Sequence, residues 1–82
     1  LEPLQSRTED IPLLIDYFRN KLSEINGVQQ PEINVKNDSL YTYSWPGNVR
    51  ELRNLVERIT ILSANENKDK INRIINDILN PS

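Results

Sequence analysis

An arginine stands inside the first turn of a predicted helix, in the stretch WPGNVREL from Trp45 to Leu52. The amino end of a helix carries a partial positive charge, so a cation such as Arg50 is mildly unfavourable there. The same end is a natural anion site, and an arginine beside it adds a bidentate donor for phosphate or carboxylate. Two kinds of partner fit this position: an anionic ligand, or a surface ion pair with Glu9, Asp10 or Glu51.

Few other residues of this chain are suited to catalysis. The sequence has no cysteine and no histidine, which excludes thiolate and imidazole metal sites and any Ser-His or Cys-His nucleophile pair. Glu9 and Asp10 form a carboxylate pair, but adjacent acids at a helix start are more typical of caps than of acid–base catalysts. No phosphate-binding loop of the form GxxxxGK[ST] is present. If a nucleotide is bound, this chain therefore forms one side of the site and does not supply the loop that holds the phosphates.

Charge and hydropathy narrow the class of protein further. The chain of 82 residues has a net charge of -2 and a pI near 5.0, without the basic surplus of a domain that grips nucleic acid through phosphates. No apolar run is long enough to span a bilayer, and no hydrophobic leader follows Leu1. We therefore expect a piece of a cytoplasmic protein with no membrane partner.

The first predicted helix lies in TEDIPLLIDYFRNKLSEING. Glu9 or Asp10 can cap it, and Pro12 sits in the first turn, where proline is tolerated. Apolar residues recur at steps of three and four, which is the spacing of one helical face: Ile11, Leu14, Ile15, Phe18, Leu22 and Ile25. Asn26-Gly27 ends the helix because glycine adopts the left-handed conformation of a helix stop. The residues before it, from Leu1 to Arg7, are expected to be extended.

The helix that carries Arg50 is expected to start at a tight turn. Pro46 and Gly47 fit the two corners, with Gly47 at a positive φ. Asn48 is a good cap, and Glu51 three residues later completes a variant of the capping box. The apolar face is Val49, Leu52, Leu55, Val56, Ile59 and Leu62. Arg53 and Glu57, four residues apart, form a solvated pair, and Trp45 is expected in the core.

Two weaker segments complete the fold prediction. A short helix is expected around Leu40, Tyr41 and Tyr43, although the preceding Asn37 and Asp38 favour turns. A terminal helix has an apolar face made of Ile71, Ile74, Ile75, Ile78 and Leu79. That face either joins the core or docks on a neighbour. The fold class is all-α, a small bundle of three to four helices.

These residues resemble a known family. WPGNVRELRNLVERITIL, preceded by PLQSRTEDIPLLIDYF, is similar to the helical lid of the AAA+ domain in sigma-54-dependent transcriptional activators, nearest to the nitrogen-regulation response regulators. The usual lead-in of that family reads close to LPPLRERxEDI, and here it is LEPLQSRTEDI. The resemblance covers roughly residues 1–63. It implies a lid subdomain over 1–63, and a linker and terminal helix over 64–82 that lead to a DNA-binding domain.

The resemblance also implies roles for four residues. Arg50 would be the sensor-II arginine, which reaches the terminal phosphates of ATP from the lid. Ile11 and Val49 would be apolar neighbours of the adenine, and Asn48 would cap the helix start. The cofactor would be ATP with Mg in the intact parent protein. The piece alone is expected to hold no nucleotide and to lack catalytic competence.

The parent implied by this family is a hexameric ATPase ring that remodels the sigma-54 RNA polymerase holoenzyme. Its phosphate loop, metal-binding acids and arginine fingers would precede Leu1, and a helix-turn-helix that binds promoter-upstream DNA would follow Ser82. The alternative from a different class is a small helical DNA-binding or adaptor module with no nucleotide role, since short helices around a turn can mimic a helix-turn-helix. The acidic balance argues against a DNA-binding role.

Overall fold

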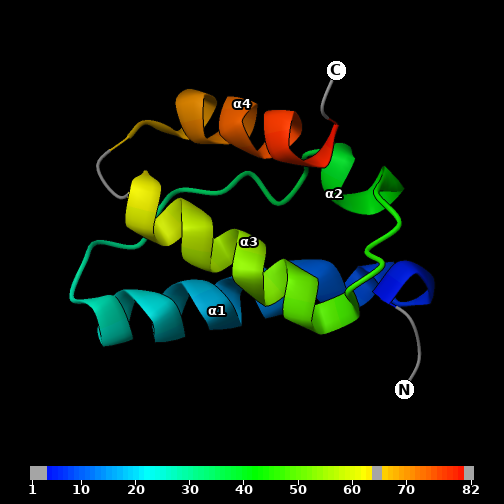
Figure 1. The fold of residues 1–82 in the computed structure, drawn as a ribbon, viewed down its shortest axis with the longest axis horizontal. Coiled ribbons are helices and arrows are strands. Elements are labelled where there is room, and N and C mark those ends of the chain that lie inside the picture. Colours follow the sequence, from blue (N-terminus) through cyan, green and yellow to red (C-terminus); the bar gives the residue numbers. More distant parts are fainter. Residues whose placement is uncertain (1–3, 64–65, 81–82) are drawn as a thin grey trace.

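The structure, a computed structural model, describes residues 4–63 and 66–80. It is all-α over these ranges, as predicted. Two 3-10 turns, η1 (Leu4–Ser6) and η2 (Thr8–Asp10), are followed by four α-helices: α1 (Ile11–Asn26), α2 (Ser39–Thr42), α3 (Asn48–Leu62) and α4 (Lys68–Leu79) (Figure 1). The lead-in was expected to be extended. Instead its 3-10 turns bury Leu4, which is 2% exposed.

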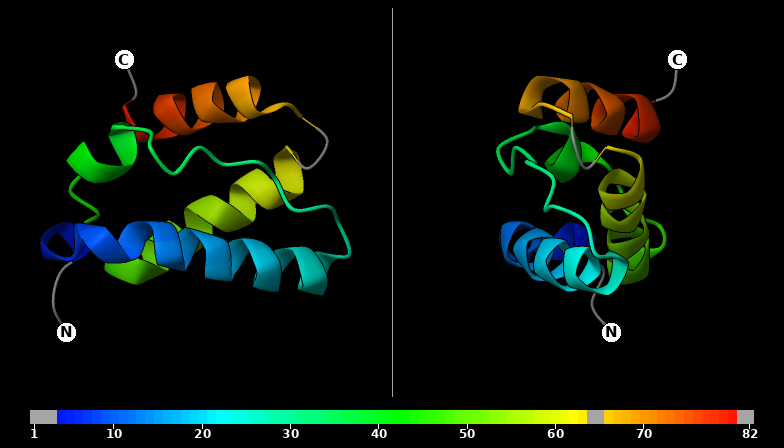
Figure 2. Two further views of the ribbon diagram at one scale, coloured as in Figure 1. Left: turned by 180° about the vertical axis from the view of Figure 1, so that it is seen from behind. Right: turned by 90° about the vertical axis from the view of Figure 1, so that its left-hand side faces the viewer.

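The helices form two layers. α1 and α3 pack against each other, and α4 lies across from them in contact with α2 and α3. Figure 2 shows the segment that links α1 to α2 running back between these layers. Pro31 and Ile33 of that segment are buried, so the linker forms part of the core.

The core is built from the apolar faces that the helical spacing predicts. Its most deeply buried members come from every helix and from the turn before α3: Ile11, Ile15, Leu22, Leu40, Trp45, Leu52, Val56, Ile59, Ile71 and Ile75. Ile25 and Leu62 are 65% and 69% exposed, because both lie at the carboxyl ends of their helices, beyond the core. Thr60 is buried although it is polar, and its hydroxyl donates to the carbonyl oxygen of Val56 at 2.8 Å.

Helix α1 begins and ends where the sequence predicts. Asp10 occupies the cap position, but its carboxylate makes no capping hydrogen bond; it pairs with Arg7, with N–O distances of 2.8 and 2.9 Å. Gly27 closes the helix at φ 65°, in the left-handed conformation, and donates its N–H to the carbonyl of Ser23. A glycine serves this stop because it has no Cβ to clash.

A chain of amide hydrogen bonds joins α4 to the segment around α2. The Asn37 side chain, 9% exposed, donates to Oδ1 of Asn72 at 2.6 Å and of Asn76 at 3.0 Å. The Ser39 hydroxyl donates to Asn76 at 2.9 Å and accepts from Asn80 at 2.9 Å. Asn72 and Asn76 are four residues apart and so share one side of α4, and Asn80 follows directly after the helix ends at Leu79.

The apolar face of α4 belongs to the core of this chain. Ile71 and Ile75 are 0% exposed and Leu79 is 5% exposed. Of the two possibilities that the sequence left open for the terminal helix, the structure therefore shows packing on the chain's own core. The helix start is capped by Asn67, whose side chain accepts the N–H of Lys70 at 2.8 Å.

Candidate functional site

The turn before α3 has an unusual backbone. Trp45 and Asn48 have φ values of 50° and 54°, whereas Gly47 has φ −89°. The prediction of a positive φ at Gly47 is therefore wrong: the left-handed positions are the two residues that flank Pro46-Gly47. Trp45 is held in this conformation by its indole, which is 1% exposed and donates to the carbonyl of Leu40 at 2.8 Å.

Asn48 does not cap the helix. Gly47 occupies the cap position without a side-chain hydrogen bond, and Asn48 is the first residue of α3. The Oδ1 of Asn48 instead accepts the backbone N–H of Leu4 at 3.2 Å, which ties the lead-in to the start of α3. The predicted cap is wrong because Asn48, at φ 54°, does not have the extended backbone of a capping residue, and its Oδ1 is bound to the lead-in. Nothing in the apolar periodicity signals the contact with Leu4.

The capping box predicted between Asn48 and Glu51 is not formed, because Glu51 reaches one residue further back, to Gly47. Its Oε1 accepts the N–H of Gly47 at 2.9 Å, and its Oε2 accepts the hydroxyl of Tyr43. The hydrogen bond to this carboxylate raises the pKa of Tyr43, with burial and the charge of Glu51 as smaller causes. The Tyr43 ring also meets Trp45 edge to face, with centroids 4.9 Å apart, so Glu51 is locked to the turn.

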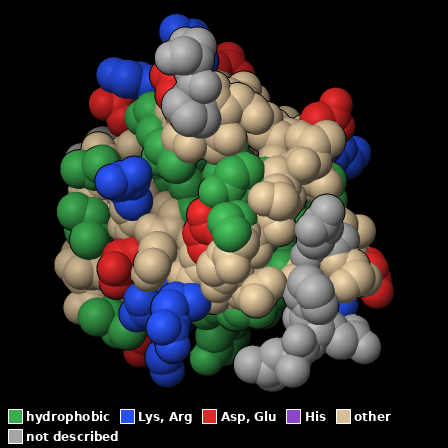
Figure 3. Space-filling model, turned by 45° about the vertical axis from the view of Figure 1, so that its right-hand side comes forward, with side chains coloured by type: hydrophobic (Ala, Val, Ile, Leu, Met, Phe, Trp, Pro, Cys, Tyr) green, Lys and Arg blue, Asp and Glu red, His purple; other side chains and the backbone are tan. Residues whose placement is uncertain are grey.

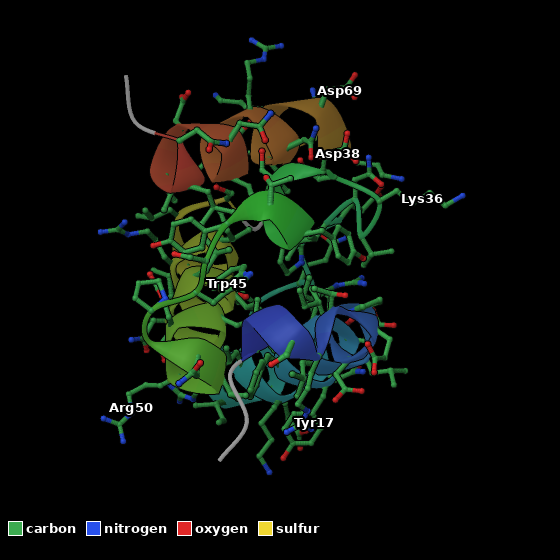
Figure 4. The ribbon with its side chains drawn as sticks, turned by 90° about the vertical axis from the view of Figure 1, so that its right-hand side faces the viewer. Tyr17, Lys36, Asp38, Trp45, Arg50 and Asp69 are labelled. Atoms are coloured by element: carbon green, nitrogen blue, oxygen red, sulfur yellow. The ribbon has the colours of Figure 1, made fainter. Side chains whose placement is uncertain are left out.

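Arg50 is exposed and makes no hydrogen bond or ion pair within residues 4–63 and 66–80. Figure 4 shows its side chain projecting away from the bundle, while Trp45 points into it. Of the three acids that could have paired with it, Asp10 binds Arg7 and Glu51 binds Gly47 and Tyr43, while Glu9 is exposed and forms no ion pair with Arg50. The described part of the chain therefore supplies no anion to the guanidinium.

The other two predicted site residues differ in their exposure. Val49 is 38% exposed and adjoins Arg50 in the first turn of α3. Ile11 is 0% exposed and lies in the core, so its side chain is not part of the surface that carries Val49 and Arg50. The structure brings Asn48, Val49 and Arg50 together on the surface, and Ile11 is not exposed beside them.

Two further predictions concern the outer face of α3 and the DNA-binding alternative. Arg53 and Glu57 form the expected ion pair, with an N–O distance of 3.6 Å.

The DNA-binding alternative depends on the helix that precedes α3. Helix α2 has four residues, about 6 Å of helix, which is too short for the first helix of a helix-turn-helix. The face drawn in Figure 3 carries both basic and acidic side chains.

The described residues also limit other kinds of site. No described helix is both long and apolar enough to cross a membrane. Across residues 4–63 and 66–80, no group of three or more Asp and Glu side chains is placed to hold a metal ion.

Comparison with known proteins gives a family match over almost the whole chain. The model of the family described as AAA+ ATPase lid domain matches residues 5–80. The chain is 46% identical over 70 residues to the DNA-binding transcriptional regulator NtrC of Azospirillum brasilense. That alignment covers 80% of this chain and 14% of the regulator. It is 43% identical over 65 residues to the nitrogen assimilation regulatory protein NtrX of Azorhizobium caulinodans, covering 78% of this chain and 14% of that one.

A third relative extends the comparison beyond nitrogen regulation. The chain is 44% identical over 62 residues to the C4-dicarboxylate transport transcriptional regulatory protein DctD of Rhizobium meliloti, covering 74% of this chain and 14% of that protein. The chain thus spans about one seventh of the length of these relatives. No solved structure gives a significant match.

Proposed function

The chain belongs to the AAA+ ATPase lid domains, among those of the sigma-54-dependent regulators, and on this basis we propose that it senses the phosphates of ATP through Arg50. The observation that carries the proposal is the free guanidinium. Arg50 is exposed in the first turn of α3 and has no partner in the described part of the chain. An arginine left without an anion in the folded lid is available to one that arrives from outside.

The local chemistry suits a polyphosphate. The first N–H groups of an α-helix have no acceptor within the helix, and the helix dipole favours negative charge at this end. Arg50 adds a bidentate donor, and Val49 offers an apolar surface next to it. Asn48 and Glu51 hold the turn that positions both residues.

The rest of the machinery belongs to the parent protein in this proposal. ATP with Mg²⁺ would supply the phosphates and the energy of hydrolysis, and the lid would respond to the loss of a phosphate by moving as a body. The parent would be a cytoplasmic hexamer that remodels the sigma-54 RNA polymerase holoenzyme. It would reach promoter-upstream DNA through a separate helix-turn-helix. Ile11 would support the adenine-facing surface from the core.

The test is the variant Arg50→Ala in the full parent protein. We expect the ATPase turnover to fall by at least about tenfold, because a positioned donor to developing charge is removed. Nucleotide affinity, measured in the same preparations, separates lost binding from lost turnover. Stability of the 82-residue chain should change by less than about 0.5 kcal/mol, because Arg50 is exposed and has no described partner.

Arg53→Ala is the matched control. Arg53 lies on the same helix and pairs with Glu57, so its loss should leave turnover within about twofold of wild type. Equal turnover in wild type and Arg50→Ala would contradict the proposal. Membership of the family would then describe the fold alone.

A further inference from the structure

A pocket of about 340 Å³ lies between α3, α4 and the segment from Tyr43 to Trp45. Its apolar lining residues are Trp45, Leu55, Ile78 and Leu79. Asn48, Val49 and Arg50 are not among its lining residues, so the proposed phosphate sensing leaves this pocket unexplained.

Opposite charges line the same pocket without pairing to each other. Arg58 is exposed, and neither its guanidinium nor the Asn54 amide has a hydrogen-bond or ion-pair partner within residues 4–63 and 66–80. The Glu51 carboxylate also lines the pocket and accepts one hydrogen bond on each oxygen. A carboxylate offers about four acceptor positions, so Glu51 can still accept from a ligand.

We propose that this pocket binds a free α-amino acid with an aliphatic side chain. The ligand's carboxylate would bind Arg58 and Asn54, its ammonium group would bind Glu51, and its side chain would cover Leu55 and Ile78. Such a ligand carries both charges and an apolar stem. The pocket volume lies at the lower end of the range for small-molecule sites, which suits a molecule of this size.

The chain has a built-in reporter for this test. Trp45 is its only tryptophan and lines the pocket, so intrinsic fluorescence reports directly on occupancy. We expect L-leucine to change this fluorescence saturably, with a dissociation constant of about 1–10 mM. Two analogues of the same shape lack one charge each: 4-methylpentanoate has no ammonium group, and 3-methylbutylamine has no carboxylate. Each should bind about tenfold more weakly than leucine.

The analogue without the ammonium group tests the Glu51 contact without disturbing the start of α3. For the other wall, Arg58→Gln should weaken leucine about tenfold and leave the affinity for 3-methylbutylamine unchanged. Arg53→Gln, on the same helix but outside the pocket, should bind leucine like wild type. Far-UV circular dichroism verifies that each variant is folded.

Three results would overturn the proposal. The first is no saturable response to leucine up to about 50 mM, well above the expected dissociation constant. The second is equal binding of leucine and either analogue, which would leave only an apolar contact. The third is a folded Arg58→Gln variant that binds leucine as wild type does.

Discussion

At the scale of single residues, Trp45 shows how a side chain can hold a backbone conformation that its type disfavours. A bulky residue with a positive φ is rare, and a residue before proline normally prefers an extended conformation. Trp45 departs from both preferences, at φ 50° and directly before Pro46. Such strain costs about 1–3 kcal/mol and persists only when the surroundings fix the residue. Here the buried indole and its bond to Leu40 do so.

The Tyr43–Glu51 bond makes stability depend on pH at high pH. The raised pKa of Tyr43 means that the folded chain keeps the phenol proton above pH 10.0, the ordinary value, where the unfolded chain releases it. The free energy of unfolding should therefore be level below that pH and fall as pH rises through the window up to the raised pKa. Urea unfolding at about pH 8 to 11 measures this fall.

Two phenylalanine variants isolate this contribution. Tyr43→Phe removes the titrating hydroxyl, so its stability should fall less steeply over the same pH range than that of wild type. Tyr17→Phe is the matched control, because Tyr17 is 58% exposed and outside this contact; its pH dependence should equal that of wild type. The same slope in wild type and Tyr43→Phe would show that the bond does not contribute.

At the scale of elements, the spacing of apolar residues predicts the helices well, whereas the hydrogen bonds of polar side chains are harder to predict from sequence. Apolar residues at steps of three and four located α1 and α3, and Gly27 marked the end of α1. The start of α3 was predicted as a turn with a cap, but the roles of Gly47 and Asn48 were wrong. An asparagine fits several local hydrogen-bonding geometries, and its sequence position does not reveal which partner it takes.

The buried Asn37 illustrates the same limit. Its type favours turns, and the short helix after it was correctly expected, but its bonds to Asn72 and Asn76 span 35 and 39 residues. Such pairing depends on the final packing of α4. Arg50 is a similar case. The sequence correctly predicts its position in the first turn of α3, but only the structure shows that it has no ion-pair partner among the described residues.

Asn76→Ala should reveal the energy of the amide chain between α2 and α4. Removing its side chain takes the acceptor from Asn37 and from Ser39, so we expect a loss of about 1–2 kcal/mol in the free energy of unfolding. Asn54→Ala is the matched control, because Asn54 is exposed, helical and without a described partner. Both substitutions make the same change in helix propensity, so the difference between them in urea unfolding reports the network. A difference near zero would contradict this assignment.

At the scale of the whole molecule, α4 decides whether the chain is one cooperative unit. The sequence led us to expect a lid boundary after residue 63, and that boundary stays a prediction. The packing of Ile71 and Ile75, both 0% exposed, joins α4 to the core of the preceding helices. The family match over residues 5–80 runs through the same helix.

Removing residues 64–82 tests this dependence directly. Each fully buried isoleucine contributes about 1.5–3 kcal/mol, so the shortened chain loses much of the stability of a small domain. We expect residues 1–63 alone to lack a cooperative urea transition, with the 82-residue chain as reference. A cooperative transition in the shorter chain would instead place a domain boundary at the predicted position.

The hydrogen bond from Leu4 to Asn48 has a mechanical consequence. It joins the lead-in to a residue two positions ahead of Arg50, across 44 residues of sequence. The lead-in is therefore attached to the first turn of α3 directly, as well as along the chain through α1. A displacement of the lead-in would therefore shift the turn that carries Arg50.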